Sequence, residues 1–311
     1  MSNRYTYIGF LANVDSTIMN YKFGPGFKVE KLSTYEAVDL LQELEDIKKF
    51  EIAEGILYDR NNINEAEDAV YIVKKQFNSI TPIDNMGNKK KMWRVSASFE
   101  YQFLNKYYNV INLLRLINGG NICITREYYL RHGQVKGFIE SQCTNLHVFT
   151  SLCSLRKDAI GRTKRLISKC QIPFNEKSLQ IAFENYEISF EQYHENMSFA
   201  SLMFGIEALF NDSKGEITYK LSRNIAVLLG ETISNAQLIE KNIKDLYDKR
   251  SKLVHNGEST VDRSHIILLQ NYLRKSIIAF NYIGKKKSII LADLKILGYG
   301  NSPVKSLLKR M

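Results

Sequence analysis

The residue types best suited to chemistry in this chain of 311 residues are an arginine and a histidine five positions apart, Arg250 and His255. A guanidinium binds a phosphate through two parallel hydrogen bonds, and an imidazole titrates near neutral pH. Together the two side chains could bind a phosphodiester and move the proton of a ribose hydroxyl. That chemistry requires no metal ion, and we expect neither a metal site nor any other cofactor.

A second arginine and histidine, Arg126 and His132, occur at similar spacing, so spacing alone does not identify a site. The segment NICITREYYL around Arg126 is rich in β-branched and aromatic residues and follows a Gly-Gly turn, which predicts a strand. In a strand the two side chains have no reason to converge. Context therefore favours the C-terminal pair.

The sequence around the C-terminal pair predicts a helix that ends just beyond His255. Asn256 and Gly257 supply a left-handed stop, and apolar residues recur at helical spacing before it. These apolar residues are Ile239, Ile243, Leu246, Leu253 and Val254. The helix dipole favours a cation at its C-terminus, which is where His255 is expected. A basic residue in a last turn is also an ordinary helix cap, and this structural interpretation stays open.

The second half of the chain reads as helical, whereas the first half mixes strand and helix signals. Helices are expected at residues 176–194, 196–211, 216–229, 234–255 and 259–283. Their connections are short, which favours an antiparallel bundle. The domain boundary is expected near 166–176, where Pro173 precedes a new helix. The predicted fold class is α+β, with a mixed α/β N-terminal domain over 1–168 and an all-α bundle with a basic C-terminal tail over 169–311.

The N-terminal half contains several local signals. Strands are expected at residues 5–12 and 69–77, and a long helix at 99–117. Phe23 to Val29 encloses Gly-Pro-Gly, which together with the first strand predicts a β-hairpin-like opening. Ser33 and Glu36 form a capping-box pattern ahead of AVDLLQELEDIKKF, which predicts the start of a helix.

Two segments, SLMFGIEALFNDSKGEITYKLSRNIAVLLGE at 201–231 and IKDLYDKRSKLVHNG at 243–257, resemble the HEPN superfamily, specifically its Apea-like branch in abortive-infection and related prokaryotic proteins. In that superfamily an arginine, a polar residue and a histidine form the signature of metal-independent ribonucleases. The resemblance therefore implies Arg250 and His255 as catalytic residues, with Ser251 as an ancillary polar contact. HEPN nucleases generally build their sites from two protomers, so it also implies a homodimer through the HEPN-like bundle.

Other residues are candidates to support this pair. Glu207, at the end of the second bundle helix, either orients Arg250 or His255 by a charge-assisted hydrogen bond or faces solvent. Asn256, beside the histidine, is a further supporting candidate. The candidate RNA-binding residues are Lys249, Lys252, Lys285, Lys286 and Lys287.

The formal net charge of +10 favours an anionic partner, and we expect nucleic acid. Each short positive cluster is also compatible with a solvated surface. The clusters are Lys89–Lys91 with Arg94, Arg162 with Lys164 and Arg165, Lys285–Lys287, and Lys309 with Arg310. Trp93, beside the first cluster, either stacks a base or begins a packed strand.

The four cysteines disfavour zinc and redox chemistry, because they show no CxxC pairing and no histidine at zinc-ligand spacing. They are Cys123, Cys143, Cys153 and Cys170. Cys143 and His147 share a helical spacing but lack a third orienting group. We expect no membrane span and no secretory signal, and hence a cytoplasmic protein.

These features predict an endoribonuclease that acts without a metal in prokaryotic anti-phage defence or a stress response. The expected partners are RNA, a second copy of the chain, and a phage-derived or regulatory protein as trigger, which the N-terminal domain would sense unless it selects the RNA. Two other classes stay open. One is a non-catalytic RNA-binding or scaffold module whose Arg250 and His255 cap a helix. The other is an antitoxin-like regulatory partner whose bundle is a dimer interface.

Overall fold

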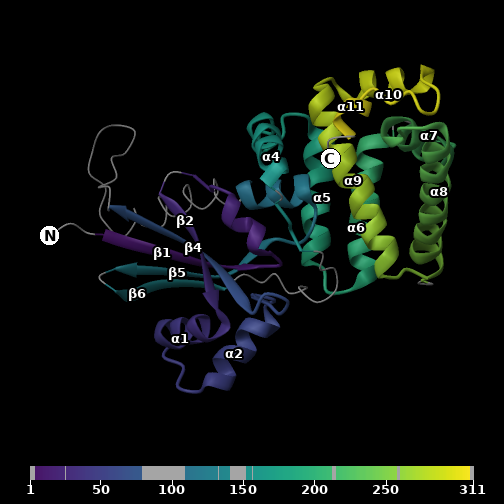
Figure 1. The fold of residues 1–311 in the computed structure, drawn as a ribbon. Coiled ribbons are helices and arrows are strands. Elements are labelled where there is room, and N and C mark those ends of the chain that lie inside the picture. Colours follow the sequence, from purple (N-terminus) through teal and green to yellow (C-terminus); the bar gives the residue numbers. More distant parts are fainter. Residues whose placement is uncertain are drawn as a thin grey trace, which may run out of the picture. The chain divides into compact units, whose positions relative to one another are not determined.

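The computed structural model describes residues 4–24, 26–78, 109–131, 133–140, 152–155, 157–211, 215–257 and 260–308. The chain divides into two compact units, the first comprising 1–115 with 120–164 and the second 116–119 with 165–311. The first contains a sheet and the second contains helices, which confirms the α+β fold class (Figure 1). The division after Lys164 lies close to the boundary predicted after residue 168.

The strands described in the first unit form one antiparallel sheet in the order β2-β4-β1-β5-β6, with β3 paired to β4. They are β1 (Arg4–Ala12), β2 (Phe27–Ser33), β3 (Ile63–Asn64), β4 (Ala69–Asn78), β5 (Cys123–Arg131) and β6 (Gln134–Glu140). The β-hairpin-like opening predicted from β1 and β2 is wrong, because β4 lies between them. Tyr7 to Ala12, apart from Gly9, are buried side chains on both faces of β1, as in a central strand, which needs a neighbour at each edge.

Two helices, α1 (Thr34–Glu45) and α2 (Phe50–Asp59), cover one face of this sheet (Figure 1). The predicted capping box is confirmed, since the Ser33 side chain accepts from the Glu36 backbone N–H and the Glu36 side chain accepts from the Ser33 backbone. Asp46 adopts a left-handed conformation with φ 54° and ends α1. The charged stretch that follows α1 hides this break, so the separate helix α2 was not predicted.

The helical layer is held to the sheet by apolar burial and by one polar group of contacts. Val38, Leu41, Ala53 and Leu57 pack with strand residues, and each larger side chain contributes about 1.5–3 kcal/mol on burial. The strand residues are Ile8, Phe10, Val70, Ile72 and Tyr128. At the end of α1, Glu45 accepts hydrogen bonds from Arg126 and from the Tyr128 hydroxyl. Both donors come from β5, so this carboxylate fixes the end of α1 to the sheet.

The second unit is helical in its described parts. Its helices are α5 (Lys177–Glu191), α6 (Glu195–Phe210), α7 (Ile217–Leu229), α8 (Ile233–Asn256), α9 (Arg263–Ile283), α10 (Lys287–Ile296) and α11 (Lys305–Leu308), while α4 (Lys157–Lys169) spans the division. All five predicted helices are present, with ends shifted by a few residues. Residues 109–118, part of the helix expected at 99–117, are also helical.

The described residues after the last predicted helix include α10 and α11, which pack into the bundle, whereas Lys309 and Arg310 of the predicted basic C-terminal tail lie outside the described residues. Ile290, Leu291 and Leu294 of α10 are buried, as are Leu307 and Leu308 of α11. Arg223 of α7 donates hydrogen bonds to the carbonyls of Leu294, Lys295 and Leu297 and so caps the end of α10. The lysine run at 285–287 favoured the prediction of a basic tail, although apolar residues at helical spacing follow it directly.

Gly205 lies where α6, the helix of Glu207, packs closely against α9 and α5. A Cβ atom at this position of α6 would lie 2.7 Å from Leu273 Cδ2 of α9 and 3.3 Å from the Ala182 carbonyl of α5. A larger residue here would therefore force Leu273 to move and would crowd the Ala182 carbonyl. Among the described helices, none combines the length and apolar character that crossing a membrane requires.

The capping contacts of Glu45 give a stability prediction. Glu45→Ala removes the acceptor of two hydrogen bonds from Arg126 and Tyr128, and should lower the free energy of unfolding by about 2–4 kcal/mol. Glu43→Ala, on the exposed side of the same helix, is the control and should change it by less than about 0.5 kcal/mol. Urea unfolding followed by circular dichroism measures both, and equal effects would contradict the assigned role.

Candidate functional site

The candidate site lies where α8 leaves the core of the bundle. Ala236, Ile239, Ile243 and Leu246 of α8 are buried, whereas Val254 is 50% exposed, so the apolar stripe predicted to reach Val254 ends earlier. The helix ends at Asn256, and Gly257 follows with φ 70°, which confirms the predicted left-handed stop. Near its end, α8 exposes Lys252, Val254 and His255 at the surface.

Arg250 is held against α6 by charge. Its Nε atom lies 3.4 Å from Oε1 of Glu207, and the two side chains are only 19% and 21% exposed. Both of these atoms are buried, and neither makes a hydrogen bond. The contact is therefore an ion pair without a directed hydrogen bond. Glu207 thus pairs with Arg250 by charge, but without the charge-assisted hydrogen bond that was expected of an orienting residue.

Two aromatic rings flank the guanidinium. Arg250 Cζ lies 6.0 Å from the ring centre of Phe204 on α6 and 5.9 Å from that of Tyr247 on α8, both at the outer limit of a cation–π contact. Burial raises the pKa of Tyr247, and the carboxylate of Glu207 raises it further while Arg250 lowers it. Neither aromatic residue was predicted. Each lies three positions before its charged partner, one helical turn away, and that spacing is the sequence signal that could have found them.

His255 does not join Arg250 in one tight pair. The histidine is exposed, and no described residue makes a hydrogen bond or ion pair with it. Five residues advance a helix by about 7.5 Å and turn it well past one full rotation, so the imidazole and the guanidinium project in different directions. Ser251 is partly exposed beside the arginine, and Asn256 is the last helical residue. One protomer therefore offers two separate contacts to a ligand.

The candidate RNA-binding lysines of α8 differ in their freedom. Lys249 donates from Nζ to the carbonyl and the hydroxyl oxygen of Thr260, at 3.1 and 3.3 Å, and so ties the end of α8 to the segment before α9. Lys252 is exposed on the last turns of α8. Of these two, Lys252 is the better placed to meet an anionic ligand beside His255.

The lysine run at 285–287 is partly engaged within the fold. Lys285 forms an exposed ion pair with Asp293 at 2.9 Å, and Lys287 donates to the carbonyl of Ala208 on α6 at 2.7 Å. Lys286 is exposed at the start of α10. The three lysines are therefore not equally available to a nucleic acid, as three solvated side chains would be.

The second arginine and histidine pair has a structural arginine. Arg126 lies in β5, as predicted for a strand, is 6% exposed, and pairs with Glu45. His132 lies outside the described residues. The same holds for Lys89–Lys91, Trp93, Arg94, Cys143, His147, Lys309 and Arg310.

The described cysteines have the character of buried thiols. Cys123, Cys153 and Cys170 are buried. Burial raises the pKa of the Cys153 thiol to about 12 and that of Cys170 to about 11, so both are protonated and poor nucleophiles at neutral pH. Within the described ranges, no three His, Cys, Asp or Glu side chains gather as metal ligands do.

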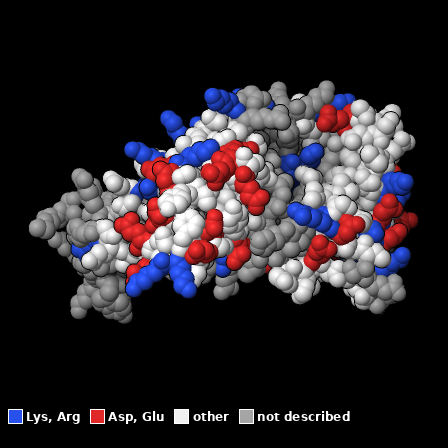
Figure 2. All heavy atoms as spheres, turned by 60° about the horizontal axis from the view of Figure 1, so that its bottom comes forward, with Lys and Arg blue, Asp and Glu red and all other residues white. Residues whose placement is uncertain are grey.

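On the face shown in Figure 2, the positive charge of the described residues is dispersed. In the view of Figure 2, Lys and Arg side chains stand in small groups between Asp and Glu side chains. Residues 34–59, which form α1 and α2, hold eight Asp and Glu against two Lys. This acidic layer repels a polyanion, so a nucleic acid is expected to bind elsewhere.

Comparison with family models, with curated proteins and with solved structures gives no match for this chain. The resemblance to the HEPN superfamily therefore rests on the motif residues themselves, now placed on α6, α7 and α8.

The ion pair gives a prediction that does not depend on activity. A double-mutant cycle of Glu207→Ala and Arg250→Ala should yield a coupling free energy of about 1 kcal/mol or more, because each change alone leaves a buried charged atom behind. The exposed pair Lys285 and Asp293 is the matched control, with an expected coupling below about 0.5 kcal/mol. Strictly additive effects of the two substitutions would show that the ion pair between Glu207 and Arg250 does not stabilise the fold.

Proposed function

We propose that this chain is a metal-independent endoribonuclease of the HEPN type, active as a homodimer in the cytoplasm of a prokaryote during phage defence or stress. The observation that supports it best is the placement of Arg250, held by Glu207 beside the exposed end of α8 that presents His255. Phosphate binding and proton transfer are the two tasks of such a site, and these are the two side chain types that perform them.

The proposed reaction is attack of a ribose 2′-hydroxyl on the adjacent phosphate. The 2′-oxygen forms a bond to phosphorus, the bond to the 5′-oxygen breaks, and the products carry 2′,3′-cyclic phosphate and 5′-hydroxyl ends. A base accepts the proton of the 2′-hydroxyl, and an acid donates a proton to the leaving 5′-oxygen. Arg250 would stabilise the negative charge that develops on the phosphate oxygens. Ser251 and Lys252 would contact the RNA nearby.

This reaction needs two proton-transfer groups, whereas one protomer presents one imidazole at the site. A two-fold dimer that brings two α8 ends together supplies a second His255 and a second Arg250. The surface beside Arg250 supports such an interface, because Phe204 of α6, whose ring faces the guanidinium, is 48% exposed and Val254 of α8 is 50% exposed. Apolar side chains so close to a charged site are typical of a surface that is covered in an assembly.

The alternative is a non-catalytic RNA-binding or regulatory module. Its specific support is the ion pair itself, because a half-buried Arg250 that joins α6 to α8 also serves the fold alone. In that case His255→Ala would leave RNA affinity unchanged and there would be no cleavage to lose.

The catalytic proposal predicts a defined loss of activity. His255→Ala should slow RNA cleavage about 10²–10⁴-fold, because proton transfer is removed. Arg250→Lys should also fail, because an ammonium cannot reproduce the two parallel hydrogen bonds of a guanidinium. His265→Ala is the matched control, since that imidazole is already used in the capping box of α9, and it should retain activity. Purified proteins are incubated with total RNA in EDTA. Activity that disappears with EDTA and returns with a divalent metal would contradict the proposal.

The dimer gives a second test. Phe204→Glu places a charge in the exposed apolar surface beside Arg250 and should shift the chain from dimer to monomer in light scattering at micromolar concentration. Leu238→Glu, at a 56% exposed position in the N-terminal part of α8, is the control and should leave the dimer intact. A wild-type chain that is monomeric, with cleavage first order in protein, would refute the two-protomer site.

A further inference from the structure

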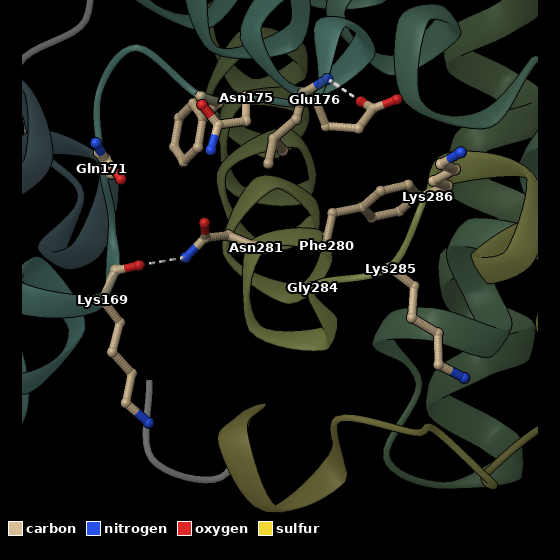
Figure 3. Close-up of a pocket in the computed structure, with 11 residues that line it drawn as sticks. Lys169, Gln171, Asn175, Glu176, Phe280, Asn281, Gly284, Lys285 and Lys286 are labelled. Atoms are coloured by element: carbon tan, nitrogen blue, oxygen red, sulfur yellow. Dashed lines mark hydrogen bonds between the residues drawn. The ribbon is translucent and has the colours of Figure 1, made fainter.

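A hollow of about 470 Å³ lies in the second unit, near the ends of three helices (Figure 3). Its walls come from the end of α4, the start of α5, the end of α9 and the segment before α10. The lining residues are Lys169, Gln171, Phe174, Asn175, Glu176, Leu179, Phe280, Asn281, Gly284, Lys285 and Lys286. Its size falls within the range of about 300–1,000 Å³ that is usual for sites of small molecules.

The charge of this hollow is positive. Three lysines line it against one carboxylate, that of Glu176. The carboxylate is occupied as the cap of α5, where it accepts from the Leu179 backbone N–H at 2.9 Å. In Figure 3 the side chains of Lys169 and Lys285 lie on opposite sides of the hollow, and that of Lys286 points in another direction. A bound dianion balances the net positive charge of the lining.

The lysines are available to an anion at small cost. Lys169 and Lys286 are exposed. Lys285 is paired with Asp293, but both side chains are about half exposed at 52% and 47%, and such a surface pair contributes little. A ligand phosphate can therefore replace or share this partner.

The remaining lining consists of a buried apolar base and two carboxamide side chains, which favour a polar organic group. Phe174, Leu179 and Phe280 are buried and form an apolar base. Asn281 is fixed by hydrogen bonds from its Nδ2 to the Lys169 carbonyl and to Cys170 Sγ, both at 3.3 Å. Its Oδ1 and the carboxamide of Asn175 lie at the hollow (Figure 3), where they can accept and donate hydrogen bonds.

We propose that this hollow is a binding site for a small organic phosphate, a phosphate monoester whose organic part carries hydroxyl or amide-like groups. The monoester has a charge of about −1.5 to −2 at neutral pH and three acceptor oxygens, toward which the flexible side chains of Lys169, Lys285 and Lys286 can turn. The carboxamides of Asn175 and Asn281 bind the organic part. This site uses neither Arg250 nor His255, although Lys285 and Lys286 were also candidates for RNA binding, and the proposal does not depend on the chain being a ribonuclease.

The adjoining surface connects this site to α6. A second hollow of about 570 Å³ shares Asn175, Glu176 and Lys286 with the first and is also lined by Lys287 and Asn211. Lys287 donates to the Ala208 carbonyl, and Ala208 directly follows Glu207, the partner of Arg250. A ligand that draws Lys287 away from the Ala208 carbonyl would thus affect α6, the helix whose Glu207 pairs with Arg250.

The test is calorimetric titration of the full chain with ribose 5-phosphate and adenosine 5′-monophosphate at fixed ionic strength, with inorganic phosphate as the probe that lacks an organic part. At least one monoester should bind, and more tightly than inorganic phosphate. Lys169→Glu and Lys286→Glu should each weaken that binding about tenfold or more, the loss of one charge-assisted contact. An acid at the start of α10 is favourable to that helix, so Lys286→Glu should remain folded.

Lys241→Glu is the matched control, since Lys241 is an exposed lysine on α8 outside both hollows and gives the same change of net charge. It should leave monoester binding unchanged. The proposal is overturned if neither monoester binds at millimolar concentration, if inorganic phosphate binds as tightly, or if Lys241→Glu weakens binding as much as Lys286→Glu. It also fails if an RNA decamer binds through Lys169 and Lys286 while the monoesters do not. That result would assign these lysines to an RNA path.

Discussion

The ion pair between Glu207 and Arg250 is the interaction on which the candidate site depends. It joins α6 to α8 beyond the last buried residue of α8, where apolar packing no longer fixes the helix. Without it, a long arginine side chain at a helix surface would lose about 2 kcal/mol of rotamer entropy on binding a ligand. With the ion pair, part of this rotamer entropy is already lost during folding, so less is lost when a ligand binds. The close approach of α6 permitted by Gly205 belongs to the same arrangement, because α6 carries Glu207.

Much of the fold could be predicted from local patterns. The capping box at Ser33, the Gly257 stop and the spacing of the bundle helices are each decided within a few residues of chain, so the sequence contains them directly. The pairing of β2 with β4 was not predictable in this way, since it depends on contacts some forty residues apart. The break at Asp46 and the folding of the lysine-rich C-terminus into α10 and α11 were missed because charged residues hide elements that tertiary packing stabilises.

The site was predicted in its residues but not in its geometry. Arg250, Glu207 and the exposed position of His255 follow from helix ends and spacing, whereas the rings of Phe204 and Tyr247 beside the guanidinium require knowledge of how α6 meets α8. The lysine run at 285–287 shows the opposite limit. Charge alone allowed either an RNA contact or a solvated surface. In the structure, Lys287 donates to the Ala208 carbonyl and Lys285 pairs with Asp293. Composition reports how many charges exist, and only packing determines which of them a ligand can reach.

The central claim is that the attacking nucleophile is a hydroxyl of the RNA itself. It is tested most directly with two RNA oligonucleotides that contain a mapped cleavage position and differ only in the sugar before the scissile phosphate, ribose in one and 2′-deoxyribose in the other. The account predicts that the wild-type chain cleaves the first in EDTA and leaves the second intact at that position. Cleavage of both oligonucleotides at the same rate would contradict it, because an activated water would then be the nucleophile.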